Sequence, residues 1–144
     1  MGNIYNSLVS DVQTAGKMVE ARNLGGKMRV FPFSFVFSTA GSAPVLYLTK
    51  IPAGTKIVDL YIETDGLSAS AGVALTIDIG DSGDADRFKA AYDADAANAA
   101  RGLVVSTGFM YAYTADTWII GAVASGKTPV DTKKLWGYFI GVQE

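Results

Sequence analysis

The chain of 144 residues contains neither histidine nor cysteine. The absence of cysteine excludes a disulfide framework, thiolate catalysis and zinc sites built from thiolates. The absence of histidine removes the side chain that most often acts as a general acid or base near neutral pH. Much of the usual catalytic chemistry is therefore missing, and we expect a protein that is not an enzyme and that has no catalytic residue and no cofactor.

Charged residues are also scarce. They make up 18% of the chain, whereas hydrophobic residues make up 49%, and an average soluble domain is about 25% charged. So little charge indicates that another molecule covers part of the surface. The net charge of −2 gives no general preference for nucleic acid, so no nucleic-acid partner is expected.

The longest uncharged stretch, residues 30–49, has the length of a membrane span. Pro32, Pro44 and the small-residue run 38–42 interrupt it, and its apolar residues alternate instead of filling a helix. Two strands joined by a loop are expected there. The first residues have neither the basic nor the apolar region of a signal peptide, and we expect no contact with a membrane.

Alternation of apolar and polar residues, which is typical of β-strands, is the strongest pattern in the chain. In residues 28–37, four phenylalanines occupy every second position, so an extended segment places all four rings on one face: Phe31, Phe33, Phe35 and Phe37. The pattern predicts further strands at 45–50, 56–64, 73–80, 103–113, 117–124 and 134–142. Seven or eight short strands of this kind predict an antiparallel β-sandwich or jelly roll.

Details of three strands follow from the same alternation. In 56–64 we expect Val58, Leu60 and Ile62 to face the core, and Asp59, Tyr61 and Glu63 to face outward. In 73–80 the expected inward residues are Val73, Leu75, Ile77 and Ile79. In 103–113 we expect a bulge at Gly108. The last strand is apolar on both faces, which predicts a central position or an interface.

Helical periodicity is found in two places. Residues 84–100 are rich in alanine and hold Phe88, Ala91 and Tyr92 near helical spacing, which predicts one short helix covering the sandwich. Residues 1–27 form an expected N-terminal arm, separate from the single domain 28–144, and the net charge through residue 29 is +2. Its apolar residues share one helical face and need a neighbour for burial. They are Ile4, Tyr5, Leu8, Val9 and Val12.

Residues 121–128 match the nucleotide-binding pattern GxxxxGK[ST]. A phosphate-binding loop must leave a parallel strand and enter a helix. Here Pro129 follows directly, and the remaining residues end in an alternating aromatic strand. We interpret the match as coincidental and expect a hairpin loop.

Four aspartates crowd one region: Asp78, Asp81, Asp84 and Asp86. Carboxylates could collect calcium, but the spacing does not fit an EF-hand loop. Asp81 and Asp84 more simply supply a turn and an N-cap for the expected helix, so no metal site is predicted, although the cluster leaves an ion open.

Two pairs of carboxylates could suggest glycoside hydrolysis, Asp59 with Glu63 and Asp93 with Asp95. We interpret them as solubilising groups on an exposed face. Aromatic residues near the C-terminus can belong to the core or to a contact surface. They are Tyr111, Tyr113, Trp118, Trp136 and Tyr138, of which Tyr111 and Tyr113 are predicted interface residues together with the five apolar arm residues.

Residues 45–142 resemble small virion structural proteins of tailed bacteriophages. The resemblance is carried by the turn and strand start at 51–58, by 79–88 and by the aromatic last strand. It implies a capsid decoration or cement protein on the capsid surface, made in the cytoplasm of the bacterial host. It also implies a homo-oligomer, for example a trimer, bound to the major capsid protein. The alternative that stays open is a carbohydrate-binding module of lectin or fibre type.

Overall fold

The computed structural model describes residues 27–37, 44–68, 75–104, 106–123, 128–130 and 132–143. Within these ranges the chain is all-β and has no helix. The strands are β1 (Lys27–Val36), β2 (Val45–Ile51), β3 (Thr55–Asp65), β4 (Thr76–Asp81), β5 (Asp84–Asp93), β6 (Ala97–Arg101), β7 (Thr117–Val123) and β8 (Lys134–Gln143). In this part of the chain no helix is long and apolar enough to cross a membrane.

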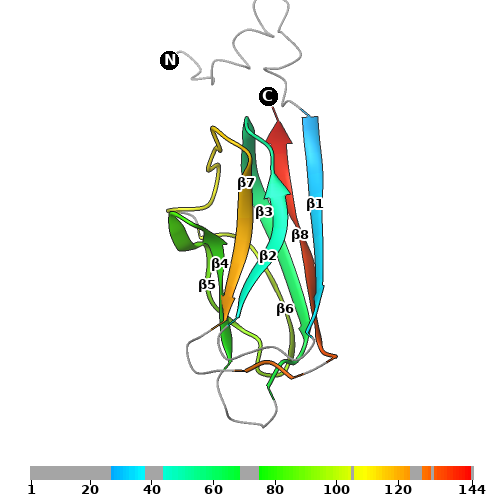
Figure 1. Cartoon of the computed structure of the whole chain (residues 1–144). Helices are drawn as coiled ribbons and strands as arrows, with labels where there is room; N and C mark the ends of the chain where they lie inside the picture. The colour runs from blue at the N-terminus through cyan, green and yellow to red at the C-terminus, as the bar shows by residue number, and fades with distance from the viewer. Residues whose placement is uncertain are drawn as a thin grey trace, which may run out of the picture.

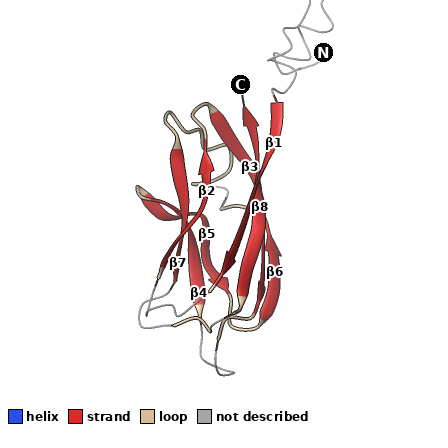
Figure 2. Ribbon diagram, turned by 45° about the vertical axis from the view of Figure 1, so that its right-hand side comes forward, coloured by secondary structure: helices blue, strands red, loops and turns tan. Residues whose placement is uncertain are grey.

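Eight strands form two four-stranded sheets that face each other (Figures 1 and 2). The strand orders are β1-β8-β3-β6 and β2-β7-β4-β5, and every pairing is antiparallel. The pairs β1·β8, β2·β7, β3·β6 and β4·β5 are nested, as they are when one long hairpin wraps around itself. This is the connectivity of a jelly roll, and the predicted all-β sandwich is confirmed.

The core lies between the sheets and follows the predicted alternation. The phenylalanine ladder of β1 faces inward, with Phe33 and Phe37 buried and Phe31 and Phe35 packed against the core. In β8, Leu135 and Phe139 are buried. Other fully buried side chains come from both sheets: Leu46, Ile51, Ile57, Leu60, Ile62, Ile77, Ile79, Phe88 and Ile119; Leu75, just before β4, is buried as well. Strand β8 lies between β1 and β3, so its two apolar faces do reflect a central position.

One inward residue of β3 differs from the prediction. Leu60 and Ile62 are buried as expected, but Ile57 takes the place of Val58, which is only half-buried. The pairing of β3 with β8 skips one residue between Ile57 and Asp59. A bulge of this kind shifts the side-chain alternation by one position, and periodicity alone cannot reveal it.

The predicted short helix at 84–100 is wrong, because this segment forms β5 and β6. Phe88 and Tyr92 are both buried, and a spacing of four residues fits one face of a strand as well as one face of a helix. Ala91 does not join them: it is exposed, with a φ of 45°, at a place where β5 has one extra residue opposite β4. Tertiary pairing outweighs the helix propensity of the alanines.

The predicted strand at 103–113, with its bulge at Gly108, is also wrong. The described residues there form turns and one isolated bridge between Ala112 and Lys56. Backbone bonds join this loop to the start of β3, for example from Tyr113 N to Thr55 O and from Met110 N to Ile57 O. At Gly108 a Cβ would lie 2.6 Å from the Arg87 carbonyl oxygen, so the glycine permits close packing of the loop against β5.

The other predicted strands are confirmed to within a few residues. Lys27, predicted as the end of the arm, is the first residue of β1. Val73 and residues 1–26, which include the five apolar arm residues, lie outside the described residues.

Candidate interaction surfaces

The outer face of the β1-β8-β3-β6 sheet has an aromatic groove with a volume of about 770 Å³. Its lining comes from β1, β3 and β8: Phe33, Ser34, Tyr61, Asp65, Lys134, Trp136, Gly137 and Tyr138. Alternation in β8 turns Trp136 and Tyr138 outward while Leu135 and Phe139 point into the core. The register places Ser34 and Glu63 on either side of Trp136, so these three side chains share the outer face.

Two tyrosines of the groove stack on each other. Tyr61 and Tyr138 are paired across β3 and β8 and stack with ring centroids 5.4 Å apart and an interplanar angle of 22°. The Tyr61 hydroxyl donates a hydrogen bond of 2.6 Å to Glu63 Oε2. This bond to a carboxylate raises the pKa of Tyr61, so the phenol keeps its proton. Both rings are therefore held on central strands in fixed positions.

Asp59 and Glu63, the first of the two carboxylate pairs considered for glycoside hydrolysis, both make contacts within the protein. Asp59 Oδ2 accepts from Arg101 Nε at 2.8 Å and from Arg101 Nη2 at 2.7 Å, and this contact raises the pKa of Arg101. Glu63 accepts the Tyr61 proton. In the second pair, Asp93 Oδ1 accepts from the backbone N of Asp95, which is a local turn bond. Asp59, Glu63 and Asp93 therefore all accept hydrogen bonds from groups of the protein itself.

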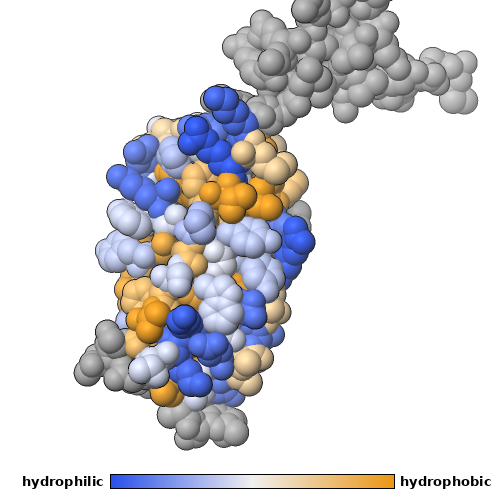
Figure 3. Space-filling model, turned by 90° about the vertical axis from the view of Figure 1, so that its right-hand side faces the viewer, coloured by the Kyte–Doolittle hydropathy of each residue, from blue (hydrophilic) through white to orange (hydrophobic). Residues whose placement is uncertain are grey.

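Large apolar side chains are exposed on both sheets. On β1, Met28 is 71% exposed, and Val30 and Val36 are also exposed. We define the β2–β7 patch as Val45, Tyr47 and Trp118; it belongs to the other sheet, and its two rings meet edge to face at 5.8 Å. Figure 3 shows the side of the molecule where β1 and β8 lie, with hydrophobic groups in orange among paler ones. Exposed apolar surface of this kind is typical of a protein covered by a partner.

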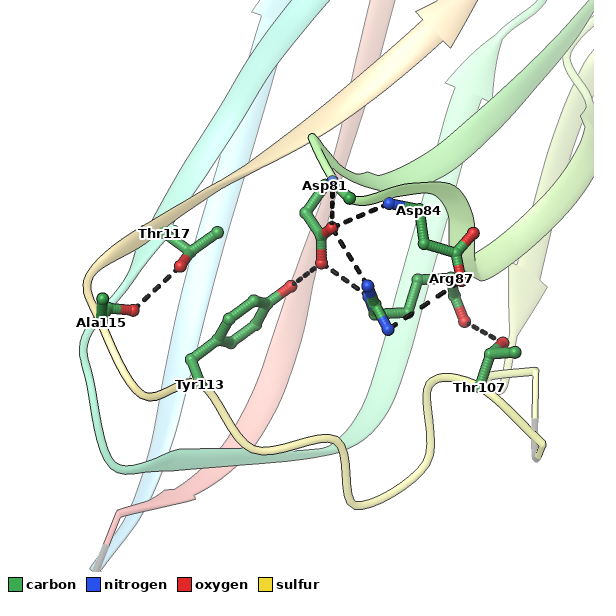
Figure 4. Close-up of polar contacts among 8 residues, drawn as sticks. Asp81, Asp84, Arg87, Thr107, Tyr113, Ala115 and Thr117 are labelled. Atoms are coloured by element: carbon green, nitrogen blue, oxygen red, sulfur yellow. Dashed lines mark hydrogen bonds and ion pairs between the residues drawn. The ribbon is translucent and has the colours of Figure 1, made fainter.

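A buried carboxylate organises the turn between β4 and β5 (Figure 4). Asp81 is 4% exposed. It accepts from the backbone N of Gly83 at 2.9 Å and of Asp84 at 3.1 Å, from Arg87 Nε at 2.7 Å and from the Tyr113 hydroxyl at 2.7 Å. Asp81 therefore does cap backbone N–H groups, as predicted, but in a hairpin turn and not at a helix start.

The Asp81 contacts have opposing effects on its ionisation. Burial tends to raise the pKa of Asp81, but hydrogen bonds from Arg87, Tyr113 and Gly83 together lower it below its ordinary value. The hydrogen bond to Asp81 in turn raises the pKa of Arg87. Burial and the bond to Asp81 raise the pKa of Tyr113. Asp81 is consequently ionised, and its oxygens are occupied by protein donors. In the part of the chain that the structure describes, no three acidic side chains are grouped so as to hold a metal ion.

The two tyrosines predicted as interface residues are joined to this cluster. Tyr113 is 6% exposed, and Tyr111 is half-buried, with the Arg87 guanidinium carbon 3.8 Å from its ring centroid. Their described contacts are internal, so an interface role for them stays a prediction. Sequence reasoning missed Arg87 itself, because its meeting with Tyr111 depends on how the loop 102–116 folds back.

Only part of the segment that matches the nucleotide-binding pattern, residues 121–128, lies within the described residues. Gly121–Val123 belong to β7, which is antiparallel to both β2 and β4. A phosphate-binding loop follows a parallel strand, so this context supports the interpretation of a coincidental match. Residues 124–127, including Lys127, lie outside the described residues.

The fold defines the chain as a β jelly roll, and solved structures with the same fold come from phage capsids. The chain is similar to a chain of the cyanophage Pam1 capsid asymmetric unit, with 24% identity, a TM-score of 0.68 and coverage of 90% of this chain and 94% of that one. It is similar to a chain of the capsid of Ralstonia phage GP4, with 17% identity, a TM-score of 0.72 and coverage of 90% and 93%.

A third similar chain belongs to the acid-stable capsid structure of Helicobacter pylori bacteriophage KHP30, with 14% identity, a TM-score of 0.60 and coverage of 83% and 91%. Comparison with known protein families gives no match. Comparison with curated protein sequences gives none either. The likeness is therefore one of fold, and it extends over most of each chain.

Proposed function

We propose that this protein is a non-enzymatic structural component of a bacteriophage virion, and that it decorates or cements the capsid by binding major capsid subunits. The observation that carries the proposal is the shared jelly roll with chains of three phage capsid structures, which covers 91–94% of those chains. The whole fold is shared, so this chain has the size and shape of a capsid component.

The surface agrees with this proposal. Met28, Tyr47 and Trp118 are large apolar side chains exposed on two opposite sheets. Burying one such side chain contributes about 1.5–3 kcal/mol, so partners on both sides would gain considerably. A capsid component with neighbours on more than one side needs contact surfaces of this kind. We also propose that the protein forms a homo-oligomer, for example a trimer, and that it lies on the capsid surface.

The position of β1 at the end of its sheet, among the described strands, gives the proposal a geometric detail. Strand β1 is at the end of its sheet, and Pro32 lies in the middle of it. Proline has no N–H to donate, so it interrupts the row of bonds that a neighbouring strand would need. We therefore expect contacts with partners on this side through sheet faces and side chains instead of strand addition along β1.

Attachment to capsids tests the proposal. Purified protein is mixed with capsids of the phage that encodes it, from which the protein has been removed, and the particles are sedimented. We expect saturable co-sedimentation at a fixed ratio to the major capsid protein. The change Tyr47→Ser combined with Trp118→Ser should weaken binding, because it removes both aromatic rings of the β2–β7 patch without altering the core.

A matched control is Lys89→Ser, on the same sheet and away from the patch. It should bind as the unchanged protein does. Protein that stays in the supernatant at every ratio, while circular dichroism shows an intact β fold, would contradict the proposal.

A further inference from the structure

The aromatic groove differs from the other apolar surfaces because polar groups without partners surround its rings. In the described part of the chain, four side chains there have no hydrogen-bond or ion-pair partner: Ser34, Lys134, Trp136 and Tyr138. Asp65 Oδ2 accepts from the backbone N of Lys134 at 3.2 Å, which fixes the carboxylate and leaves Oδ1 free for a ligand. Half-buried aromatic groups normally place their polar end on a partner.

The mixture of groups favours one class of ligand. The centre of a protein interface is depleted of charge, but here a carboxylate and an ammonium group lie beside the rings. A saccharide fits this mixture, because a hexose with equatorial substituents has flat C–H faces for stacking and hydroxyls around its edge that both donate and accept. The volume of about 770 Å³ falls in the range of ~300–1,000 Å³ found for ligand sites.

We propose that the aromatic groove binds a neutral oligosaccharide of equatorially substituted hexoses, such as β-1,4-linked glucose or N-acetylglucosamine. Trp136 and the Tyr61–Tyr138 pair provide the stacking surface. Asp65 accepts hydrogen bonds from sugar hydroxyls, and Ser34 and Lys134 donate to them. The rings stand on the central strands β3 and β8, so the site is preformed and little ordering opposes binding. This activity is additional to attachment to the capsid and does not require it.

The two tryptophans allow a direct measurement. Trp118 and Trp136 are the only tryptophans in the sequence, so Trp118→Phe leaves Trp136 as the sole source of tryptophan emission. In this background the emission of Trp136 is followed while chitohexaose or cellohexaose is added, and the same protein is applied to an array of hexose and hexosamine oligosaccharides. We expect a saturable change in emission with at least one of the two probes and matching signals on the array.

Three changes locate binding in the groove. Ser34→Arg fills the groove from the exposed edge strand without touching the core, and it should abolish binding. Tyr138→Ala should weaken binding by about tenfold or more, the equivalent of one stacked ring, whereas Tyr138→Phe keeps the ring and should lose clearly less affinity than Tyr138→Ala. The control Tyr47→Ala, on the opposite sheet, should bind normally.

The outcomes separate this proposal from the proposed virion role. Saccharide binding lost in Ser34→Arg, with capsid co-sedimentation retained, is the expected result. The absence of saturable binding to either probe and to every array member, in protein with an intact β spectrum, overturns it. If Ser34→Arg leaves saccharide binding unchanged, the groove is not the site. Loss of capsid attachment in that variant without any saccharide binding shows that the groove is a protein contact.

Discussion

At the scale of single residues, the Asp81 cluster shows most clearly what holds the loop 102–116 against the sandwich. Its carboxylate binds two backbone N–H groups, an arginine and a tyrosine from separate segments. We predict that Tyr113→Phe lowers the free energy of unfolding by about 1–3 kcal/mol, because a buried carboxylate loses a donor. Urea denaturation measures this change. Tyr111→Phe is the control and should cause little change; equal losses in the two variants would show that the bond to Asp81 is unimportant.

The lowered pKa of Asp81 makes a second prediction at this scale. A carboxyl group with a lower pKa in the folded state stabilises the fold above its unfolded pKa of about 3.9, and this contribution disappears as the pH falls through the folded pKa. The melting temperature should therefore fall below about pH 4. Asp81→Asn should be less stable at pH 7 and should show a flatter dependence in this acidic range.

The surroundings of Asp81 supply the control for the pH experiment. Arg87, Tyr113 and Asp84 face the site. Asp84 also raises the pKa of Asp86, and a raised pKa in the folded state makes stability fall as the pH rises, which is opposite to the effect of Asp81. Because these groups are common to both proteins, the difference between their curves isolates Asp81. Parallel curves for the two proteins would contradict the proposed role.

At the scale of strands, period-two alternation predicted the positions of most strands because each sheet has one face on the core. The alternation gave wrong results where one strand has an extra residue opposite its partner. The extra residue at Val58 moves Ile57 inward, and the extra residue in β5 leaves Ala91 exposed between Phe88 and Tyr92. Spacing alone could not distinguish helix from strand there.

The aromatic residues of the groove were visible in the sequence, but their grouping with Asp65 and Lys134 depends on the pairing of β8 with β3.

Two glycines of the inner faces provide a test at this scale. At Gly137 in β8 a Cβ would lie 2.1 Å from the Tyr61 carbonyl oxygen, whereas at Gly121 in β7 it would meet only side-chain atoms at 3.4 Å or more. We predict that Gly137→Ala lowers the free energy of unfolding by about 2 kcal/mol or more, and Gly121→Ala by less than about 1 kcal/mol. Denaturation curves measure both values. A smaller effect at Gly137 than at Gly121 would contradict the tight packing of β8 against β3.

At the scale of the whole molecule, the apolar arm residues remain the predicted means of association. Ile4, Tyr5, Leu8, Val9 and Val12 precede β1 in the sequence and lie outside the described residues. We predict that deleting residues 1–26 leaves the β spectrum intact but lowers the sedimentation mass or the binding to capsids, because these side chains need a neighbour for burial. Loss of the β spectrum would make the segment part of the core. Unchanged association would exclude it from the interface.

The virion role is tested most directly by a quantitative mass-spectrometric inventory of purified particles of the phage that encodes the protein. A decoration or cement protein contacts capsid subunits over the whole shell. We predict that the protein is present in intact virions at a copy number of the same order as that of the major capsid protein, in a fixed ratio between preparations. Absence of the protein from purified particles, or its presence in only a few copies, would contradict the proposed role on the capsid.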